Sequence, residues 1–237
     1  TRTDQNYVVF VHLLSDVGTM IAQRDTYPGL GRYPTTTWDP GGTFADTYRV
    51  HLPDTAYAPD AGYVQVGLYL PGGARLTMPD GQDALRLASV AIQARPGEFP
   101  NPQEANFGDQ IALLGYKLDR RVVEPGDSIQ LTLYWQALVS MDTDYRGFAH
   151  VLGSENQIWA NSDSLLRDEE TPTSQWRAEQ VVTEVRVLPV EPGTPPAFYD
   201  IEAGIYEPSG SRLPILAEGG HHLGSRILLS KIRVEEK

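Results

Sequence analysis

Short runs of alternating apolar and polar residues occur along most of the chain, and turn-forming residues separate them. Alternation with a period of two is typical of β-strands that bury one face. Proline, glycine, asparagine and aspartate gather between the runs, as they do in the turns that join strands. The sequence therefore predicts an all-β protein in which helix is minor. The predicted strands cover residues 7–14, 19–25, 43–52, 63–69, 85–94, 110–116, 122–123, 128–135, 145–152, 199–206 and 226–235.

One part of this pattern occurs twice in the chain. The positions Tyr7, Phe10, His12, Asp25 and Trp38 match Tyr145, Phe148, His150, Asp163 and Trp176, each 138 positions later. No gap is needed between the first and the last of these matches, so one structural unit has been used twice. The repeat predicts two tandem β-sandwich domains of immunoglobulin or fibronectin-III type, with Trp135 in the core of the second.

A proline-rich connector at residues 95–102 predicts the boundary between the two domains, which we place at residues 1–98 and 99–237. The first domain has no counterpart of the predicted strands 110–116 and 128–135, because Thr1 aligns with Val139. We therefore expect the first sandwich to lack its opening strands and to expose both a strand edge and apolar side chains. Upstream residues, the second domain or a second copy of the chain would cover them, and self-association through this edge is one expected outcome.

Composition narrows the classes of partner. The chain has 19 basic and 31 acidic residues, and its formal charge of -12 repels nucleic acid, which we exclude as a partner. No apolar run approaches the roughly 20 residues that span a bilayer, so we expect no membrane insertion by this segment. The absence of cysteine excludes disulfides and thiolate metal sites.

Several short motifs occur together in the chain: Leu-Leu-Gly-Tyr at 113–116, Pro-Gly-Asp at 125–127, Leu-Thr-Leu-Tyr-Trp-Gln at 131–136, and the repeated Phe-x-His, Pro-Thr-x-x-Trp and Gly-x-Tyr-x-Pro. This combination resembles repeat domains at the C-terminal, extracytoplasmic ends of large bacterial membrane proteins. Those proteins look like dolichyl-phosphate-mannose-type glycosyltransferases of Chloroflexi-like bacteria. The resemblance implies a β-sandwich in the cell envelope, as the soluble part of a membrane protein. Its motifs are strand and turn signatures, so it assigns no catalytic residue here.

The repeated histidines are the first candidates for a ligand site. Alternation places His12 on the same strand face as Phe10, and it brings Asp25 to the adjoining strand, within reach of an Asp–His hydrogen bond. His150 and Asp163 repeat this arrangement. A structural histidine inside a packed strand explains the same pattern. No nucleophile lies near either histidine in sequence, so a catalytic triad is not predicted.

Two carboxylates suggest a metal site. Asp142 and Asp144 form an Asp-x-Asp pattern, and the matching positions Asp4 and Asn6 also carry oxygen donors. Calcium binds six to eight oxygens, so a calcium-binding loop needs more ligands than these, and a solvated turn is the alternative. We otherwise predict no cofactor.

Exposed aromatic rings would suit a carbohydrate ligand, because their faces match the apolar faces of sugar rings. Trp159 is the candidate, since its counterpart in the first repeat is Ile21. The leading hypothesis is a non-catalytic interaction or spacer module that binds another envelope protein. A carbohydrate-binding module and a hydrolytic enzyme with a site between the repeats are the alternatives.

Overall fold

The computed structural model describes residues 2–53, 56–94, 97 and 99–236, and the chain forms two compact units, Thr1–Ala94 and Arg95–Lys237. The predicted boundary lay after residue 98. Residues just beyond it pack in the second unit, where the Phe99 ring lies 5.2 Å from that of Tyr134. The backbone N–H of Tyr116 also donates to the carbonyl of Pro100 at 3.0 Å. We describe each unit by itself.

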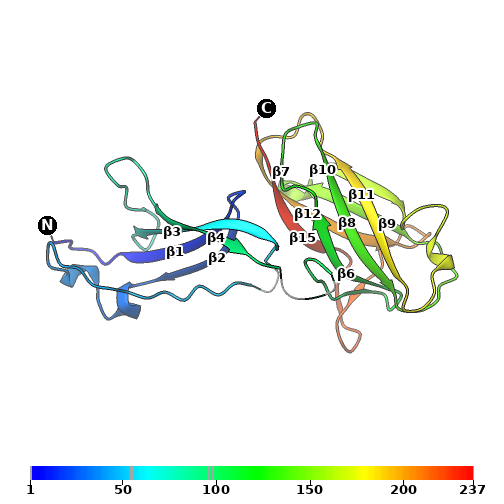
Figure 1. The fold of residues 1–237 in the computed structure, drawn as a ribbon, viewed down its shortest axis with the longest axis horizontal. Helices are drawn as coiled ribbons and strands as arrows, with labels where there is room; N and C mark the ends of the chain where they lie inside the picture. Colours follow the sequence, from blue (N-terminus) through cyan, green and yellow to red (C-terminus); the bar gives the residue numbers. More distant parts are fainter. Residues whose placement is uncertain (1, 54–55, 95–96, 98, 237) are drawn as a thin grey trace. The chain divides into compact units, whose positions relative to one another are not determined.

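The second unit consists of two sheets that lie face to face (Figure 1). One has the strand order β10-β9-β12-β15-β7, and the other has the order β11-β8-β6-β5-β13-β14. The strands are β5 (Ala105–Phe107), β6 (Ile111–Leu118), β7 (Val122–Val123), β8 (Ser128–Ala137), β9 (Arg146–Leu152), β10 (Ile158–Leu165), β11 (Val181–Pro189), β12 (Ala197–Tyr206), β13 (Ile215–Leu216), β14 (His222–Gly224) and β15 (Ile227–Val234).

The core of the second unit lies between these sheets. Strand β8 alternates strictly, and its inward residues Ile129, Leu131, Leu133 and Trp135 are fully buried, as predicted for the tryptophan. The facing residues of β9 and β12 are equally buried; they are Ala149, Val151, Ile201, Ala203 and Ile205. The burial of these apolar side chains is the main contribution to the stability of the sandwich.

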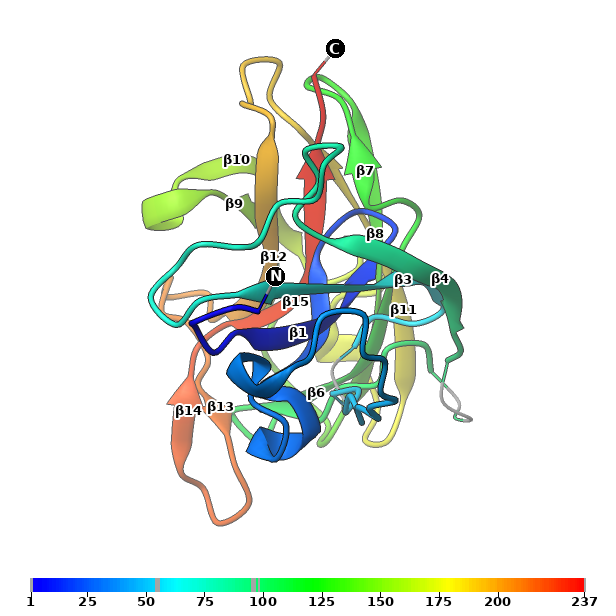
Figure 2. The same cartoon turned by 90° about the vertical axis from the view of Figure 1, so that its left-hand side faces the viewer.

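The described residues of the first unit form a single sheet with the order β2-β1-β3-β4, of which Figure 2 labels β1, β3 and β4. Its strands are β1 (Val8–Ser15), β2 (Met20–Thr26), β3 (Asp60–Tyr69) and β4 (Leu85–Ile92). They correspond to β9, β10, β12 and β15, so this sheet is the counterpart of one of the two sheets in the second unit. The all-β prediction is confirmed: the described residues contain only short 3-10 turns besides strands, namely η1 (Pro28–Gly31), η2 (Thr35–Thr37), η3 (Ser154–Asn156) and η4 (Thr173–Gln175).

The strand predicted at residues 43–52 is wrong, because this segment joins no strand among the described residues. Its counterpart β11 pairs with β8 from Val181–Gln136 to Pro189–Ser128. A strand is stabilised by the neighbour to which it hydrogen bonds, and the described part of the first unit offers no equivalent of β8. The strand pattern is present in the sequence, but the described residues of the first unit include no partner strand for it.

Contacts within the loops repeat closely between the units. The backbone N–H of Tyr7 donates to Thr35 Oγ1 at 3.0 Å, and that of Tyr145 donates to Thr173 Oγ1 at 2.8 Å. Each of these threonines also donates to a backbone carbonyl at 2.7 Å, that of Gln5 or of Thr143. The repeated Pro-Thr-x-x-Trp motif is therefore a turn that fastens the loop to the start of β1 or β9.

The repeated tryptophans differ in burial. Trp176 is 2% exposed, whereas Trp38 is only half-buried and packs edge-on against Phe44 at 4.8 Å. Both indole N–H groups still bond a carbonyl five residues earlier, that of Thr171 or Tyr33. Of the two repeated tryptophans, Trp176 is therefore a core residue and Trp38 is not.

We predict that Phe148→Ala and Trp176→Ala each lower the free energy of unfolding of the second unit by about 3–5 kcal/mol, the range for removing a buried aromatic side chain. Both side chains are nearly inaccessible to solvent. The control Phe198→Ala removes a phenylalanine that is 46% exposed and should change stability by only about 0.5 kcal/mol. Denaturant unfolding measures all three, and equal losses in the three variants would contradict the assignment.

Candidate functional site

The repeated Phe-x-His motif lies on the outer face of its sheet. In β9, Gly147 faces the other sheet, because a Cβ there would meet the Arg186 side chain. Alternation then directs Phe148 and His150 away from the inter-sheet core. Both are nevertheless buried, at 1% and 3% exposed. The Phe148 ring rests on Gly204, and the Arg212 guanidinium lies 4.4 Å above it.

His150 is held between two carboxylates. Its Nδ1 lies 2.8 Å from Glu202 Oε1, and its Nε2 lies 2.9 Å from Asp163 Oδ1. Arg226 Nη1 donates to the other Glu202 oxygen at 2.7 Å. We call these four residues the His150 cluster. Each ring nitrogen of His150 therefore lies within hydrogen-bond distance of a carboxylate oxygen.

The cluster balances its buried charge. The side chains of His150 and Glu202 are 4% and 2% exposed, while Asp163 and Arg226 reach solvent. Burial raises the pKa of Glu202, but the hydrogen bonds from His150 and Arg226 outweigh it, so the pKa lies below its ordinary value. Glu202 is therefore the ionised centre of the cluster.

The first unit keeps only half of this arrangement. His12 Nε2 lies 3.1 Å from Asp25 Oδ1, but its buried Nδ1 has no hydrogen-bond partner among the described residues. The strand register places Gln65 opposite His12, where Glu202 stands opposite His150. Ala84 takes the position of Arg226, as the pairing of β4 and β15 with their neighbours shows. The first unit thus lacks both the carboxylate and the guanidinium at these two positions.

The structure therefore brings together the predicted pairs His12–Asp25 and His150–Asp163. Sequence reasoning missed Glu202 and Arg226, which complete the second pair. The alternation of β12 could have indicated Glu202, because it puts this residue on the same face as Gly204, beneath the Phe-His motif. Both ring nitrogens of His150 are engaged by carboxylates, so neither is free to act as a base. A ligand role for the two predicted Asp–His pairs stays a prediction.

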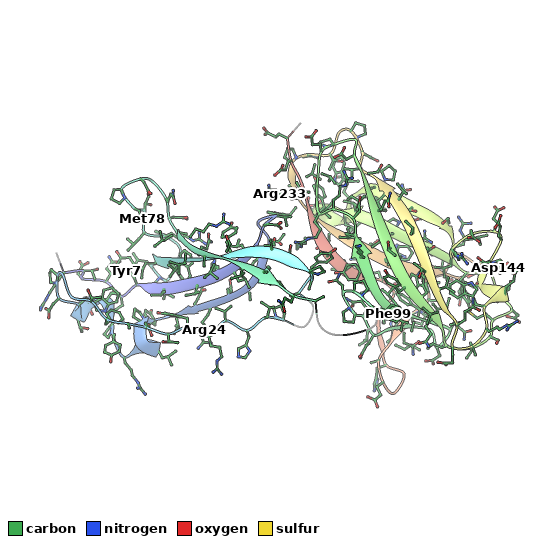
Figure 3. The ribbon with its side chains drawn as sticks, in the orientation of Figure 1. Tyr7, Arg24, Met78, Phe99, Asp144 and Arg233 are labelled. Carbon is green, nitrogen blue, oxygen red and sulfur yellow. The ribbon has the colours of Figure 1, made fainter. Side chains whose placement is uncertain are left out.

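The predicted metal ligands hold a turn. Asp144, in the loop before β9 (Figure 3), accepts the backbone N–H of Ser174 at 3.1 Å through Oδ1. Asn6 does the same for Thr36 at 3.2 Å. Asp142 accepts the hydroxyl of its neighbour Thr143 at 3.1 Å. In the part of the chain that the structure describes, no three His, Asp or Glu side chains are grouped to hold a metal ion. Among the described residues, no third ligand joins Asp142 and Asp144 at the predicted calcium site.

Trp159 is half-buried and packs within the second unit. Its ring stands at 77° to that of Tyr199, with the centroids 6.4 Å apart. A Cβ on Gly153 would lie 2.8 Å from Trp159 Nε1, so the indole rests on this glycine. These two rings are therefore not coplanar, as the aromatic rings of a sugar-binding platform would be.

A second buried ion pair lies in the inter-sheet core. Arg186 Nη2 donates to Glu184 Oε1 at 2.7 Å, and both side chains are 2% exposed. The Trp135 indole donates to Glu184 Oε2 at 2.8 Å, and Arg186 Nη1 donates to the Ser162 carbonyl at 2.7 Å. These bonds tie β8 and β11 to β10, which belongs to the opposite sheet.

The other candidate site is apolar and lies on the first unit. The face of β1 and β3 that corresponds to the covered face of β9 and β12 is partly open, and we call it the open face; it comprises Val9, Val11, Leu13, Val64, Val66 and Leu68. Two hollows of about 380 and 330 Å³ lie along it. Leu13, Val64, Val50 and Leu52 line the first, so residues 43–52 form one wall. Sequence reasoning expected such exposure but not these hollows.

We predict that Glu202→Gln makes the stability of the second unit less dependent on pH in the acid range. Because the folded-state pKa of Glu202 lies below the ordinary value of 4.5, its carboxylate stabilises the fold fully above that value. This contribution is lost as the pH falls through the folded-state pKa. Thermal melts between about pH 7 and pH 3 should therefore fall less steeply in the variant. The exposed Glu218→Gln is the control, and a parallel loss in Glu202→Gln and the parent would contradict the assignment.

We predict that Arg186→Met costs about 3–5 kcal/mol of stability, because it leaves the Glu184 charge buried without its partner. The double variant Glu184→Gln/Arg186→Met removes both charges and should recover most of that loss. Denaturant unfolding of the single and double variants measures the difference. A single variant as stable as the double one would show that the pair does not constrain the core.

Comparisons with known proteins identify no family for this chain. Neither a protein-family model nor a curated protein matches it. Among solved structures, it is similar to a Niemann-Pick type C2 protein from the Japanese carpenter ant, with a TM-score of 0.33 and 9% identity. That match covers 56% of this chain and 98% of the ant protein. None of the described helices is long and apolar enough to cross a membrane.

Proposed function

We propose that this chain is a non-catalytic interaction module that belongs to the extracytoplasmic part of a larger, membrane-anchored, glycosyltransferase-like protein. Its second unit is a self-contained support, and its first unit supplies the binding surface. The observation that carries the proposal is the open face. Val64, Val66 and Leu68 remain half-buried there, whereas their counterparts Ile201, Ala203 and Ile205 are fully buried. Open apolar faces of this kind are typical of interaction surfaces.

We further propose that the two units are repeats of one immunoglobulin or fibronectin-III-like sandwich. The two-sheet order of the second unit supports this, with β11, β8 and β6 on one side and β9, β12 and β15 on the other. A tyrosine corner supports it as well: Tyr199, near the start of β12, donates its hydroxyl to the Pro195 carbonyl at 2.6 Å. The first unit is then the same sandwich without its opening strands.

The polar clusters favour a structural role over catalysis. The His150 cluster is closed by its own hydrogen bonds, and the Glu184–Arg186 pair lies in the core. Both neutralise charge internally, whereas a catalytic group needs a face that a substrate can reach. The formal charge of -12 also disfavours polyanionic partners and anionic surfaces.

We predict that the chain binds the neutral dye Nile red and that Val64→Thr/Val66→Thr lowers the bound fluorescence by about half or more, because the hydroxyls make the open face less apolar. Threonine keeps the β-branched shape that suits a strand. The control Val185→Thr/Val187→Thr changes two exposed valines on the outward face of β11 and should leave the signal unchanged. Dye binding that is absent, or equal in all three proteins, would overturn the proposal.

A glycan array separates this proposal from a carbohydrate-binding module. Binding through the open face should show no sugar preference, because the face offers apolar side chains and few polar groups. Sugar-specific binding that persists in Val64→Thr/Val66→Thr and is lost in Trp159→Ala would instead support the carbohydrate alternative.

A further inference from the structure

We propose that the open face of the first unit binds an antiparallel pair of β-strands with the chemistry of β6 and β8, and that residues 43–52 become a strand by pairing with the second of them. This inference rests on the proposed function and names the partner of that surface. Because β6 and β8 are used in the core of the second unit, the strand pair comes from polypeptide outside residues 1–237.

Residues 43–52 already occupy the place of β11. In the second unit, Glu184 of β11 accepts the backbone N–H of Arg167 at 2.9 Å. In the first unit, Asp46 accepts the backbone N–H of Gly29 at 2.7 Å. Gly29 and Arg167 are 138 positions apart, and both have a positive φ, 60° and 69°. The same bond therefore fastens both segments over their sheets, although only β11 has a neighbouring strand.

The side chains of this segment also point as those of β11 do. Tyr48 donates its hydroxyl to Asp46 at 2.7 Å, as Arg186 donates to Glu184 at 2.7 Å. Val50 and Leu52 line one hollow of the open face, and Phe44, Asp46 and Tyr48 line the other. Alternate residues thus face the sheet, in the register that β11 has.

The hollows define what the occupant must supply. Phe44 is 40% exposed and Leu52 is 46% exposed, so the occupant must present apolar side chains toward them. In the second unit this is the role of Leu131, Leu133 and Trp135. The Trp135 indole also donates to Glu184, so the occupant carries a hydrogen-bond donor that reaches Asp46 from the same position. A strand with this pattern satisfies the side chains and the backbone of residues 43–52 together.

Two other occupants fit less well. A small apolar ligand would fill the hollows of about 380 and 330 Å³, but it would not pair the backbone of residues 43–52. A second copy of this chain carries the same formal charge of -12, so two copies repel each other, and it offers no free counterpart of β8. A separate strand pair has neither difficulty.

A register-specific disulfide tests the proposal, and the absence of cysteine makes it selective. In the second unit, Val185 of β11 stands opposite Thr132 of β8. The position that matches Val185 is Thr47. We therefore expect the full chain with Thr47→Cys to form a disulfide with a peptide of residues 99–138 that carries Thr132→Cys. The cross-strand geometry brings the two Cβ atoms within about 5.5 Å. The same peptide with Leu133→Cys, which points to the other face, is the control and should react at least tenfold more slowly.

A chain with a copy of residues 99–138 placed directly before Thr1 gives a second measurement that does not depend on peptide solubility. Hydrogen exchange of the amides of residues 43–52 should slow by about 100-fold, because the copied β8 pairs with them. Nile red binding should fall at the same time. The control copy carries Leu131→Ser, Leu133→Ser and Trp135→Ser and should leave the hydrogen exchange of these amides unchanged.

The outcomes are distinct. Register-specific trapping together with protection by the copied strands supports the inference. Equal trapping of both cysteine peptides, no protection by the copied strands, or amides of residues 43–52 that are already protected in the monomeric parent chain would each overturn it. Protection that appears only with dimerisation would assign the face to a second copy instead. Nile red binding without trapping or protection would overturn this inference alone, whereas a parent chain that binds no dye would overturn the proposed function.

Discussion

The packing of one apolar sheet face against another is the constraint on which both units depend. Hydrogen bonds between strands satisfy the backbone, but the inward side chains need a second layer. In the second unit, β8 meets both needs, because it pairs with β6 and β11 and presents fully buried side chains to β9 and β12. The described residues of the first unit form the sheet without this layer, so its inner face stays partly open and residues 43–52 join no strand.

The sequence predicts those parts of the fold that local interactions determine. The Pro-Thr-x-x-Trp turn forms in both units because the tryptophan indole N–H bonds a carbonyl five residues earlier and the tryptophan backbone N–H bonds the carbonyl of the threonine. Residues 43–52 have the same kind of pattern as β11, yet only β11 has a strand beside it. Alternation also does not show which face of a strand is buried, since Glu184 and Arg186 point inward while the neighbouring Val185 and Val187 are exposed. Strand pairing and burial depend on residues far away in sequence.

The His150 cluster, too, could be predicted from the sequence only in part. The Asp–His pairs could be predicted, because 13 positions separate His150 from Asp163 and adjacent strands carry them. Glu202 is 52 positions from His150 and reaches it only through the pairing of β9 with β12. A buried carboxylate needs compensation, and Arg226 supplies it. The first unit has neutral residues, Gln65 and Ala84, at both positions, as expected if neither charge is tolerated without the other.

The outer face of the first unit shows that its open inner face is a local feature. The Arg75 guanidinium lies 4.4 Å above the Phe10 ring, and Arg212 lies 4.4 Å above Phe148. Gly67 and Gly204 each leave room for the same ring, and Phe10 and Phe148 are equally buried. A unit that was loosely packed throughout would have lost this arrangement. The exposure of apolar strand residues in the first unit therefore concerns the face that β8 covers in the second unit, which is where an added pair of strands would bind.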